Sequence, residues 1–199
     1  MIGICQKCGS HEWNRVVEGN TITCPDCGER WNYIKKPLYI LTGCSGIGKT
    51  TTAQELQKTT TDFVFQDADI FYNIMPGETE EDSYDQVEQV GLLSKNIMQS
   101  GKPVVWTMAG NIDKIPHTYN ARFFSEIRVL ALVADEQSIR KRMTEGRKIT
   151  DENWIEGSVS YNNYFKTHTQ LGNTKFEVVD TEGKTVAEVA GEVLEWLRK

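Results

Sequence analysis

The chain has 199 residues, of which 39% are hydrophobic, so it contains enough apolar material for one folded domain and a small additional unit. Its formal net charge of −6 excludes a general electrostatic attraction to nucleic acids or to anionic membranes. The first residues lack a basic leader with a long apolar stretch, and no run approaches the ~20 apolar residues of a membrane span, so we expect a cytoplasmic protein without a membrane partner.

Four of the five cysteines form two C-x-x-C pairs, Cys5 with Cys8 and Cys24 with Cys27. Fifteen residues separate the pairs, a spacing typical of a structural zinc site with four thiolate ligands. Residues 1–36 resemble a zinc ribbon. Such a unit is too small to fold by hydrophobic burial alone, so we expect Zn²⁺ to supply its folding free energy. The absence of other paired cysteines fits a reducing compartment.

Three aromatic residues of this ribbon, Trp13, Trp31 and Tyr33, are candidates for stacking on nucleic acid bases. Packing against the metal-binding turns or against the larger domain is the favoured interpretation. The ribbon contains five basic and four acidic residues, which is a poor electrostatic footprint for a nucleic acid partner. His11 as a replacement for one cysteine ligand, and a redox role of the cysteine pairs, are the weaker alternatives.

The segment Gly43–Thr50 is a complete phosphate-binding loop, G-x-x-x-x-G-K-[ST], and the apolar run Leu38–Thr42 leads directly into it. Its glycines let backbone N–H groups converge on phosphate oxygens, and the helix that follows adds its positive end. We expect Lys49 to lie along the β- and γ-phosphates of ATP and Thr50 to bind Mg²⁺. The predicted nucleotide-binding residues are Gly43, Cys44, Ser45, Gly46, Ile47, Gly48, Lys49, Thr50 and Thr51.

Apolar runs alternate with amphipathic segments throughout residues 37–199, after a joint at residues 35–37. This alternation predicts right-handed βαβ units, and therefore a three-layer α/β fold with a parallel five-stranded sheet between two helical layers. Helix-capping signals begin at Thr79 and at Thr185. The predicted strands are 38–42, 63–66, 104–108, 127–133 and 176–179.

Ligands of open α/β sheets bind beyond the carboxyl ends of the strands, where Asp67 and Asp69 follow the second run. One carboxylate can order metal-bound water, and the other can accept the proton of a hydroxyl that attacks the γ-phosphate. A helix cap and a solvated turn residue are the alternative interpretation.

From Leu38 onward the chain resembles the P-loop kinases of nucleosides, nucleotides and small metabolites, with adenylate-kinase-like architecture. The string Asp-x-Phe-Tyr at residues 69–72 is similar to the segment after strand two of uridine kinases, whose aspartate contacts the phosphoryl acceptor. The resemblance therefore implies Asp69 as the catalytic base, with Asp67 as the alternative. Gluconate and chloramphenicol kinases also have an aspartate in this region.

The segment 134–147 is similar to the fourth strand, the helix and the lid of the same kinases, which implies that Arg142 and Arg147 close over the triphosphate. Guanidinium groups suit this task because their planar donors match phosphate oxygens. A solvated basic helix face is the alternative, and it fits Arg140 and Lys141 better. The third run, Val104–Met108, departs from the common pattern because it has no acidic residue for Mg²⁺.

The acceptor side of the site is less well defined by the sequence. Residues 78–88 include six acidic and no basic residues, which would disfavour a polyphosphate acceptor if they faced the cleft; a solvated helix face is an equally good interpretation. The aromatic residues that follow the lid are candidates for stacking on a ring or, as the favoured interpretation, for core packing. They are Trp154, Tyr161, Tyr164 and Phe165.

The sequence thus predicts an ATP- and Mg²⁺-dependent kinase that phosphorylates a small molecule, nucleoside or nucleotide. One alternative is a polynucleotide 5′-hydroxyl kinase whose ribbon holds the strand, which the acidic balance does not favour. Another is a nucleotide-dependent regulatory module that recruits a partner through its ribbon. The identity of the acceptor and the oligomeric state are not defined by the sequence.

Overall fold

The structure is a computed structural model that describes residues 2–77 and 79–199, with the side chain of Tyr72 left out. Its centre is a five-stranded, fully parallel sheet with the strand order β10-β7-β4-β6-β5. The strands are β4 (Leu38–Thr42), β5 (Val64–Asp67), β6 (Val104–Thr107), β7 (Ile127–Val133) and β10 (Glu177–Asp180). The predicted five-stranded α/β fold is confirmed, and each predicted strand lies within one residue of its place.

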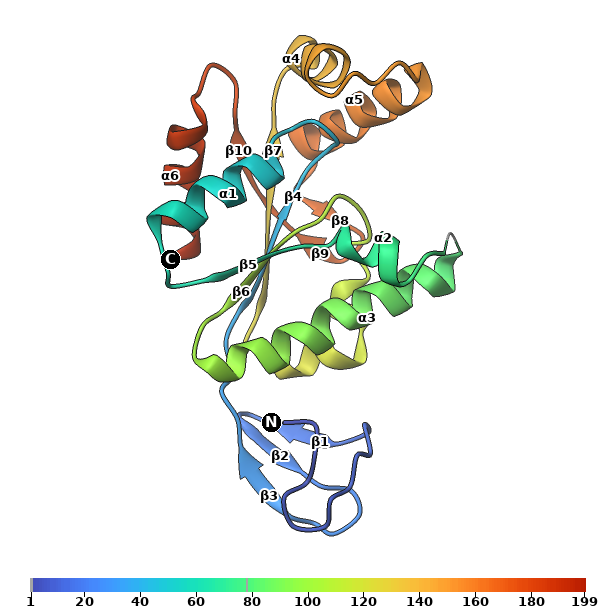
Figure 1. Cartoon of the computed structure of the whole chain (residues 1–199), viewed down its shortest axis with the longest axis vertical. Helices are drawn as coiled ribbons and strands as arrows, with labels where there is room; N and C mark the ends of the chain where they lie inside the picture. Colours follow the sequence, from blue (N-terminus) through green and yellow to red (C-terminus); the bar gives the residue numbers. More distant parts are fainter. Residues whose placement is uncertain (1, 78) are drawn as a thin grey trace.

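Helices cover both faces of this sheet, as Figure 1 shows. On one face α1 and α6 pack against each other, and α3 lies across the other face. The α-helices are α1 (Lys49–Thr59), α2 (Ile70–Ile74), α3 (Glu80–Ile97), α4 (Glu136–Lys141), α5 (Glu152–Thr167) and α6 (Val186–Leu197). Shorter helical turns are η1 (Met98–Ser100), η2 (Ile115–His117), η3 (Tyr119–Phe123) and the π-helical η4 (Arg142–Gly146), and β8 (Gln170–Leu171) pairs with β9 (Thr174–Lys175).

The central strand β4 is buried along its whole length because both faces of the sheet are covered. Tyr39 and Leu41 belong to the apolar cluster under α1 and α6, whereas Leu38 and Ile40 belong to the cluster under α3. Successive side chains of a strand point to opposite faces, so one continuous apolar run supplies two cores. This arrangement fixes the end of β4, where the phosphate-binding loop begins.

Both predicted helix caps are present. The Thr79 side chain accepts from the backbone N–H of Asp82, and the Asp82 carboxylate accepts from the N–H of Thr79, which starts α3. Thr185 and Glu188 form the same reciprocal pair at the start of α6. These pairs satisfy N–H groups that have no partner inside a helix, so they set where each helix begins.

The first residues form a separate three-stranded antiparallel sheet, β1 (Val16–Glu18), β2 (Thr21–Thr23) and β3 (Arg30–Asn32). Figure 1 shows this ribbon beside the beginning of β4, at the opposite end of the large sheet from the phosphate-binding loop. A third apolar cluster joins it to the larger unit: Ile2, Ile22 and Tyr33 of the ribbon pack with Phe123 of η3. The division at residues 36 and 37 stays a prediction.

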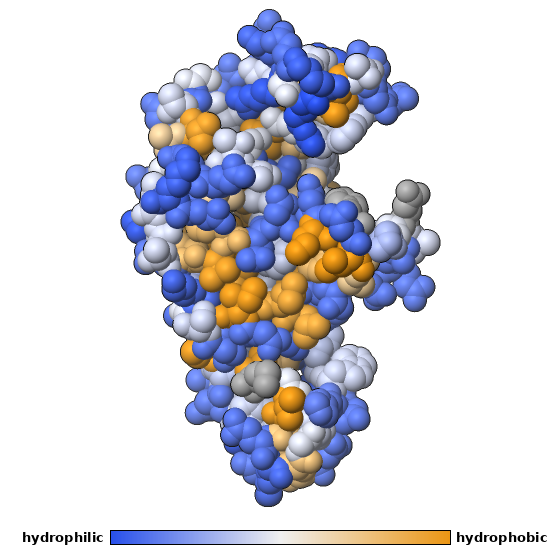
Figure 2. Space-filling model, in the orientation of Figure 1, coloured by the Kyte–Doolittle hydropathy of each residue, from blue (hydrophilic) through white to orange (hydrophobic). Residues whose placement is uncertain are grey.

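The molecular surface in Figure 2 is mostly hydrophilic at its two ends, and apolar surface gathers over the middle of the visible face. Five large exposed hydrophobic side chains belong to α2 and α3: Ile70, Ile74, Tyr84, Leu92 and Leu93. Within the described residues, no helix has both the length and the apolar character needed to cross a bilayer.

Candidate functional site

The phosphate-binding loop joins the end of β4 to α1, as its sequence predicts. Gly43, Gly46 and Gly48 have φ angles of 132°, 76° and 111°, which residues with a side chain rarely adopt. Space is a second restraint at Gly43, because an added Cβ would lie 2.6 Å from the carbonyl oxygen of Leu132. The loop therefore takes its shape from glycine geometry and from close packing against β7.

Lys49 is the first residue of α1, and its ammonium group donates to the carbonyl oxygens of Gly43 at 2.8 Å and Cys44 at 2.9 Å. Burial lowers the pKa of Lys49. The cap residue Gly48 provides no side-chain acceptor, so the first turn of α1 is open to an anion. A buried ammonium group and a helix N-terminus at one loop are chemically suited to phosphate.

Thr50 and Asp67 lie together beside this loop, although they are 17 positions apart in sequence. The Thr50 hydroxyl donates to the Asp67 carboxylate at 3.1 Å, and the second carboxylate oxygen accepts from the backbone N–H of Asp69 at 3.1 Å. At the end of β6, the hydroxyl of Thr107 is buried and has no hydrogen-bond partner among the described residues. These oxygen donors fit a Mg²⁺ ion, which prefers oxygen ligands and retains several waters and phosphate oxygens.

Three cavities meet around the loop and share walls. The largest of them, about 660 Å³, is lined by the loop, Asp67, Asp69, Thr107 and Arg147. A second cavity of about 270 Å³ lies on the other side of Gly46 and Gly48. A third pocket, of only about 30 Å³, shares Asp69 and Ala109 with the largest cavity. The three cavities therefore lie in a row in which each shares lining residues with the next, and the phosphate-binding loop stands between the first two.

The structure separates the two arginines that were expected to close over the triphosphate. Arg147 lines the largest cavity, 5.6 Å from the ring of Trp154, whose indole N–H donates to the Ser45 hydroxyl at 3.2 Å. Arg142 lines the second cavity, where it donates to the Ile47 carbonyl at 3.1 Å and to the Thr181 hydroxyl at 3.2 Å. These two hydrogen bonds hold Arg142 against the loop's outer side, away from Asp69.

Arg140 pairs with acidic residues of its own helix and of α5, at 2.7 Å from Glu136 and 2.6 Å from Glu156. This matches the solvated helix face that was its favoured interpretation.

The other aromatic candidates take part in packing. Phe165 is fully buried, Tyr164 stacks on His168 with a centroid distance of 4.0 Å, and Tyr161 donates to the carbonyl oxygen of Ala109 at 2.8 Å. Burial raises the pKa of Tyr161 to about 12, so it stays protonated and keeps this hydrogen bond at neutral pH. Tyr161 therefore fixes the loop that forms the common wall of two cavities.

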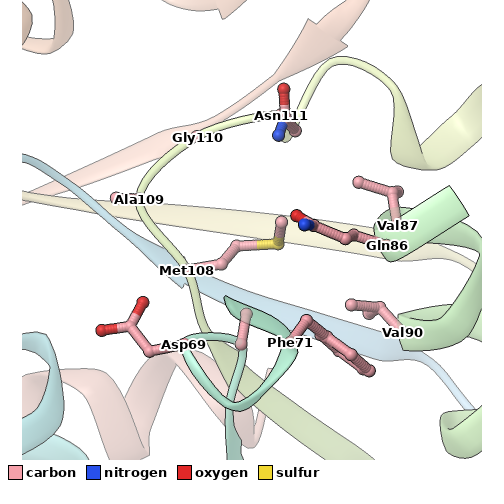
Figure 3. Close-up of a pocket in the computed structure, with 10 residues that line it drawn as sticks. Asp69, Phe71, Gln86, Val87, Val90, Met108, Ala109, Gly110 and Asn111 are labelled. Carbon is pink, nitrogen blue, oxygen red and sulfur yellow. The ribbon is translucent and has the colours of Figure 1, made fainter. Parts of the chain in front are cut away.

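Figure 3 shows the small pocket beside Asp69. Its walls come from α2, α3 and the loop after β6, and its lining residues include Phe71, Gln86, Met108 and Asn111. The sequence analysis missed Gln86 and Asn111. The position of Asn111 just after the third strand was the available signal, because such positions face ligands in these sheets.

The acidic run before and within α3 does not line this pocket in the described residues. Glu80, Glu81 and Asp85 are exposed, and Asp82 caps the helix. Glu88 accepts from the backbone N–H groups of Tyr119 at 2.8 Å and Asn120 at 2.9 Å. Glu78 lies outside the described residues. The run is therefore a helix face with structural contacts at both ends.

Far from this site, the four ribbon cysteines gather with all sulfur atoms within 4.8 Å of one another. The Cys5–Cys27 and Cys8–Cys24 sulfur atoms are 3.7 Å apart. Four sulfurs at the usual Zn–S distance of about 2.3 Å from one tetrahedral ion would be about 3.8 Å apart. The cluster is therefore a candidate metal centre.

Most of the aromatic side chains of the ribbon pack against other side chains, which was the favoured interpretation. Tyr33 is buried against Phe123, with ring centroids 5.7 Å apart, and the Arg15 guanidinium lies over Trp31. Trp13 is 68% exposed, although its edge contacts Tyr119. His11 is outside the sulfur cluster.

The chain matches no model of a known protein family and no curated protein sequence. Its fold is similar to a sugar kinase of Janibacter sp. HTCC2649, with a TM-score of 0.60, 17% identity, and coverage of 82% of this chain and 95% of that chain. It is also similar to a gluconokinase of Sinorhizobium meliloti 1021, with a TM-score of 0.59, 16% identity, and coverage of 84% of this chain and 94% of that chain. For the APS kinase of Mycobacterium tuberculosis, solved with AMPPNP and APS, the TM-score is 0.55 and the identity is 14%. The match covers 84% of this chain and 99% of that chain. The chain therefore has the fold of small-molecule P-loop kinases.

Proposed function

We propose that this protein is an ATP-dependent kinase that transfers the γ-phosphate to a hydroxyl group of a small molecule. The observation that carries the proposal is the position of Asp69, which lines both the phosphate cavity and the small pocket beside it. The similar structures include kinases of a sugar, of gluconate and of APS, which supports a small-molecule acceptor.

Each of the three neighbouring cavities would hold one part of the reactants. The nucleoside part of ATP would occupy the cavity beside Arg142 and Thr181, and the phosphates would occupy the cavity with Lys49 and Arg147. Thr50 and Asp67 would hold Mg²⁺, which supplies charge neutralisation at the β- and γ-phosphates. The acceptor would occupy the pocket on the far side of Asp69.

The two aspartates differ in what they already bind. Asp67 is engaged by Thr50 and by the N–H of Asp69, whereas Asp69 begins α2 without a side-chain cap hydrogen bond. Asp69 is therefore the better base. As the acceptor oxygen bonds to the γ-phosphorus, its O–H proton passes to the Asp69 carboxylate, and the bond from the γ-phosphorus to the ADP oxygen breaks. Lys49 and Arg147 stabilise the charge on the transferred group.

We also propose that the sulfur cluster holds a structural Zn²⁺ ion, because four cysteine sulfurs at tetrahedral spacing form a closed site. The ribbon lies at the opposite end of β4 from the phosphate-binding loop, a separation of at least one strand, or about 17 Å at 3.3 Å per residue. This distance does not favour a polynucleotide kinase in which the ribbon holds the strand at the reacting phosphate.

The experiment compares Lys49→Ala and Asp69→Asn with the control Asp62→Asn, an exposed residue paired with Arg198. We expect Lys49→Ala to lose ATP binding. Asp69→Asn should keep ATP binding and lose about 10²–10⁴-fold of the acceptor-stimulated release of ADP. ATP turnover that no sugar, nucleoside, nucleotide or aminoglycoside stimulates would instead favour the regulatory module.

A further inference from the structure

We propose that the acceptor is an uncharged alcohol with an apolar part, and that the pocket beside Asp69 discriminates against acceptors that carry a carboxylate, sulfate or phosphate group. This inference rests on the proposed kinase function and specifies the substrate class of the same site. It follows from the apolar walls of the pocket, from its neutral hydrogen-bonding groups and from its single charge.

Most of the side chains that line the pocket are apolar and closely packed. Phe71 of α2, Val87 and Val90 of α3, and Met108 after β6 are each at most 6% exposed, and all four line the pocket. Figure 3 shows them converging from three different elements of the fold. The part of an acceptor that enters this space of about 30 Å³ must place carbon atoms against them, because a polar group there would lose its hydrogen bonds to water.

The polar groups at the rim are uncharged amides. The Gln86 side chain donates to the Met75 carbonyl at 2.9 Å, which anchors it and leaves its own carbonyl oxygen for the pocket. Asn111, with a φ of 60°, is held in this unusual conformation by a turn in which the N–H of Lys114 donates to its carbonyl oxygen at 3.1 Å. Amides both donate to and accept from hydroxyl groups, so these two residues suit an alcohol.

Asp69 carries the one charge among the ten described residues that line the pocket. The nearby cations lie outside the pocket: Lys114 is over the ring of Tyr84, and Lys49 and Arg147 line the phosphate cavity. An anionic acceptor would thus face the Asp69 carboxylate and the incoming γ-phosphate without a compensating cation. A cationic acceptor would pair with Asp69 and occupy the base. An uncharged acceptor avoids both conflicts.

The test uses isosteric pairs that differ only in charge: 4-(hydroxymethyl)benzamide with 4-(hydroxymethyl)benzoate, and gluconamide with gluconate. The readout is acceptor-stimulated release of ADP by the full chain, with phosphorylated product identified by mass spectrometry. We expect the amide of each pair to be used with a kcat/KM at least about tenfold above that of the carboxylate, a discrimination of the size that one uncompensated charge gives.

A charge variant makes the test independent of the wild-type preference. Gln86→Arg places a cation at the pocket and keeps a donor for the Met75 carbonyl, so we expect the preference to shift at least about tenfold toward the carboxylates. Gln89→Arg, on the same helix but outside the pocket lining, should keep the wild-type preference. Retained ATP binding verifies that each variant is folded.

The outcomes separate the two proposals. Equal use of both members, or a preference for the carboxylates, in the wild-type protein would overturn the inference and leave the kinase function standing. The same holds if Gln86→Arg and Gln89→Arg shift the preference equally. Failure of every acceptor to stimulate ADP release, with ATP binding intact, would overturn the proposed kinase function itself.

Discussion

The ribbon and the sheet domain are ordered by different physical means. The sheet domain buries two apolar clusters, one on each face of its sheet. The ribbon has one small cluster, of which Phe123 comes from the other unit, and its remaining organisation centres on four cysteines. Small units seldom fold by burial alone, so we expect the ribbon, unlike the sheet domain, to depend on a bound metal and on its neighbour.

The two units also differ in how their candidate sites are built. The two cysteine turns of the ribbon have the same backbone pattern, in which the N–H of Gly9 donates to the Cys5 carbonyl and that of Gly28 donates to the Cys24 carbonyl. In the sheet domain, the candidate site combines side chains from the ends of β4, β5 and β6. A local motif thus specifies the ribbon, but only the whole sheet assembles the candidate site.

The largest expected effect comes from breaking the metal centre. We expect Cys24→Ser, or removal of metal by a chelator, to unfold β1–β3, because structural Zn²⁺ contributes ~10 kcal/mol or more to such units. The large sheet should keep its structure. The measurements are the zinc content of the protein and hydrogen exchange, followed separately for the ribbon and for β4–β10. Cys44→Ser is the matched control, since Cys44 is a buried thiol outside the cluster. Simultaneous unfolding of both units would contradict the contrast.

The next-largest expected effect comes from Phe123, a residue of the sheet domain that packs against the ribbon. Phe123 is 2% exposed, contacts Tyr33 and lies 4.4 Å below the ammonium group of Lys95. Phe123→Ala should cost ~3–5 kcal/mol and split thermal unfolding into two transitions, with the ribbon first. Phe165→Ala, at a fully buried site of the sheet cluster, should lower the main transition without splitting it. If both variants unfold in a single step, the units are one cooperative body.

The main features of both units were predictable from the sequence. The cysteine spacing and the phosphate-binding loop are local patterns, because the chemistry requires ligands or N–H groups from neighbouring residues. The strands were equally accessible, since a parallel sheet covered on both faces needs continuous apolar runs. The metal itself and the roles of individual site residues stay predictions.

The positions of individual site residues in the folded structure could not be predicted equally well. Arg142 and Arg147 are close in sequence and were expected to act together, yet hydrogen bonds to Ile47 and Thr181 hold Arg142 on the other side of the loop. Gln86 lines the pocket only because α3 packs on the sheet with that face inward. No local pattern encodes the rotation of a helix about its axis relative to a distant loop.

A third prediction concerns the oxygen ligands at the ends of the strands. Asp67→Asn removes the only charged partner of Thr50 that the structure shows, so the Mg²⁺ concentration for half-maximal activity should rise about 10–100-fold, equivalent to ~1.5–3 kcal/mol for an interaction with a charged group. The measurement is a Mg²⁺ titration at saturating ATP. Asp62→Asn should leave the titration unchanged. An unchanged titration for Asp67→Asn would place the metal elsewhere and leave the ribbon's centre as the only supported metal site.

The smallest effect lies at the junction of the two units, where Lys95 donates to Asn120 at 2.6 Å. Burial lowers the pKa of Lys95 from 10.5 to about 8, an effect that Glu88 opposes and that Arg15 and Arg122 reinforce. Between these pH values the unfolded chain holds a proton that the folded chain has released, so unfolding takes up a proton and the free energy of unfolding rises with pH.

The Lys95→Met variant should lose this contribution, so the difference in stability between wild type and variant should change in favour of the wild type from pH 8 to pH 10. Urea unfolding at several pH values measures that difference, and Lys102→Met provides an exposed control. A constant difference would mean that Lys95 keeps its ordinary pKa, and therefore that water reaches the junction. The two units would then be joined through Phe123 and its apolar neighbours without a desolvated charge beside them, which is a looser connection than a buried Lys95 implies.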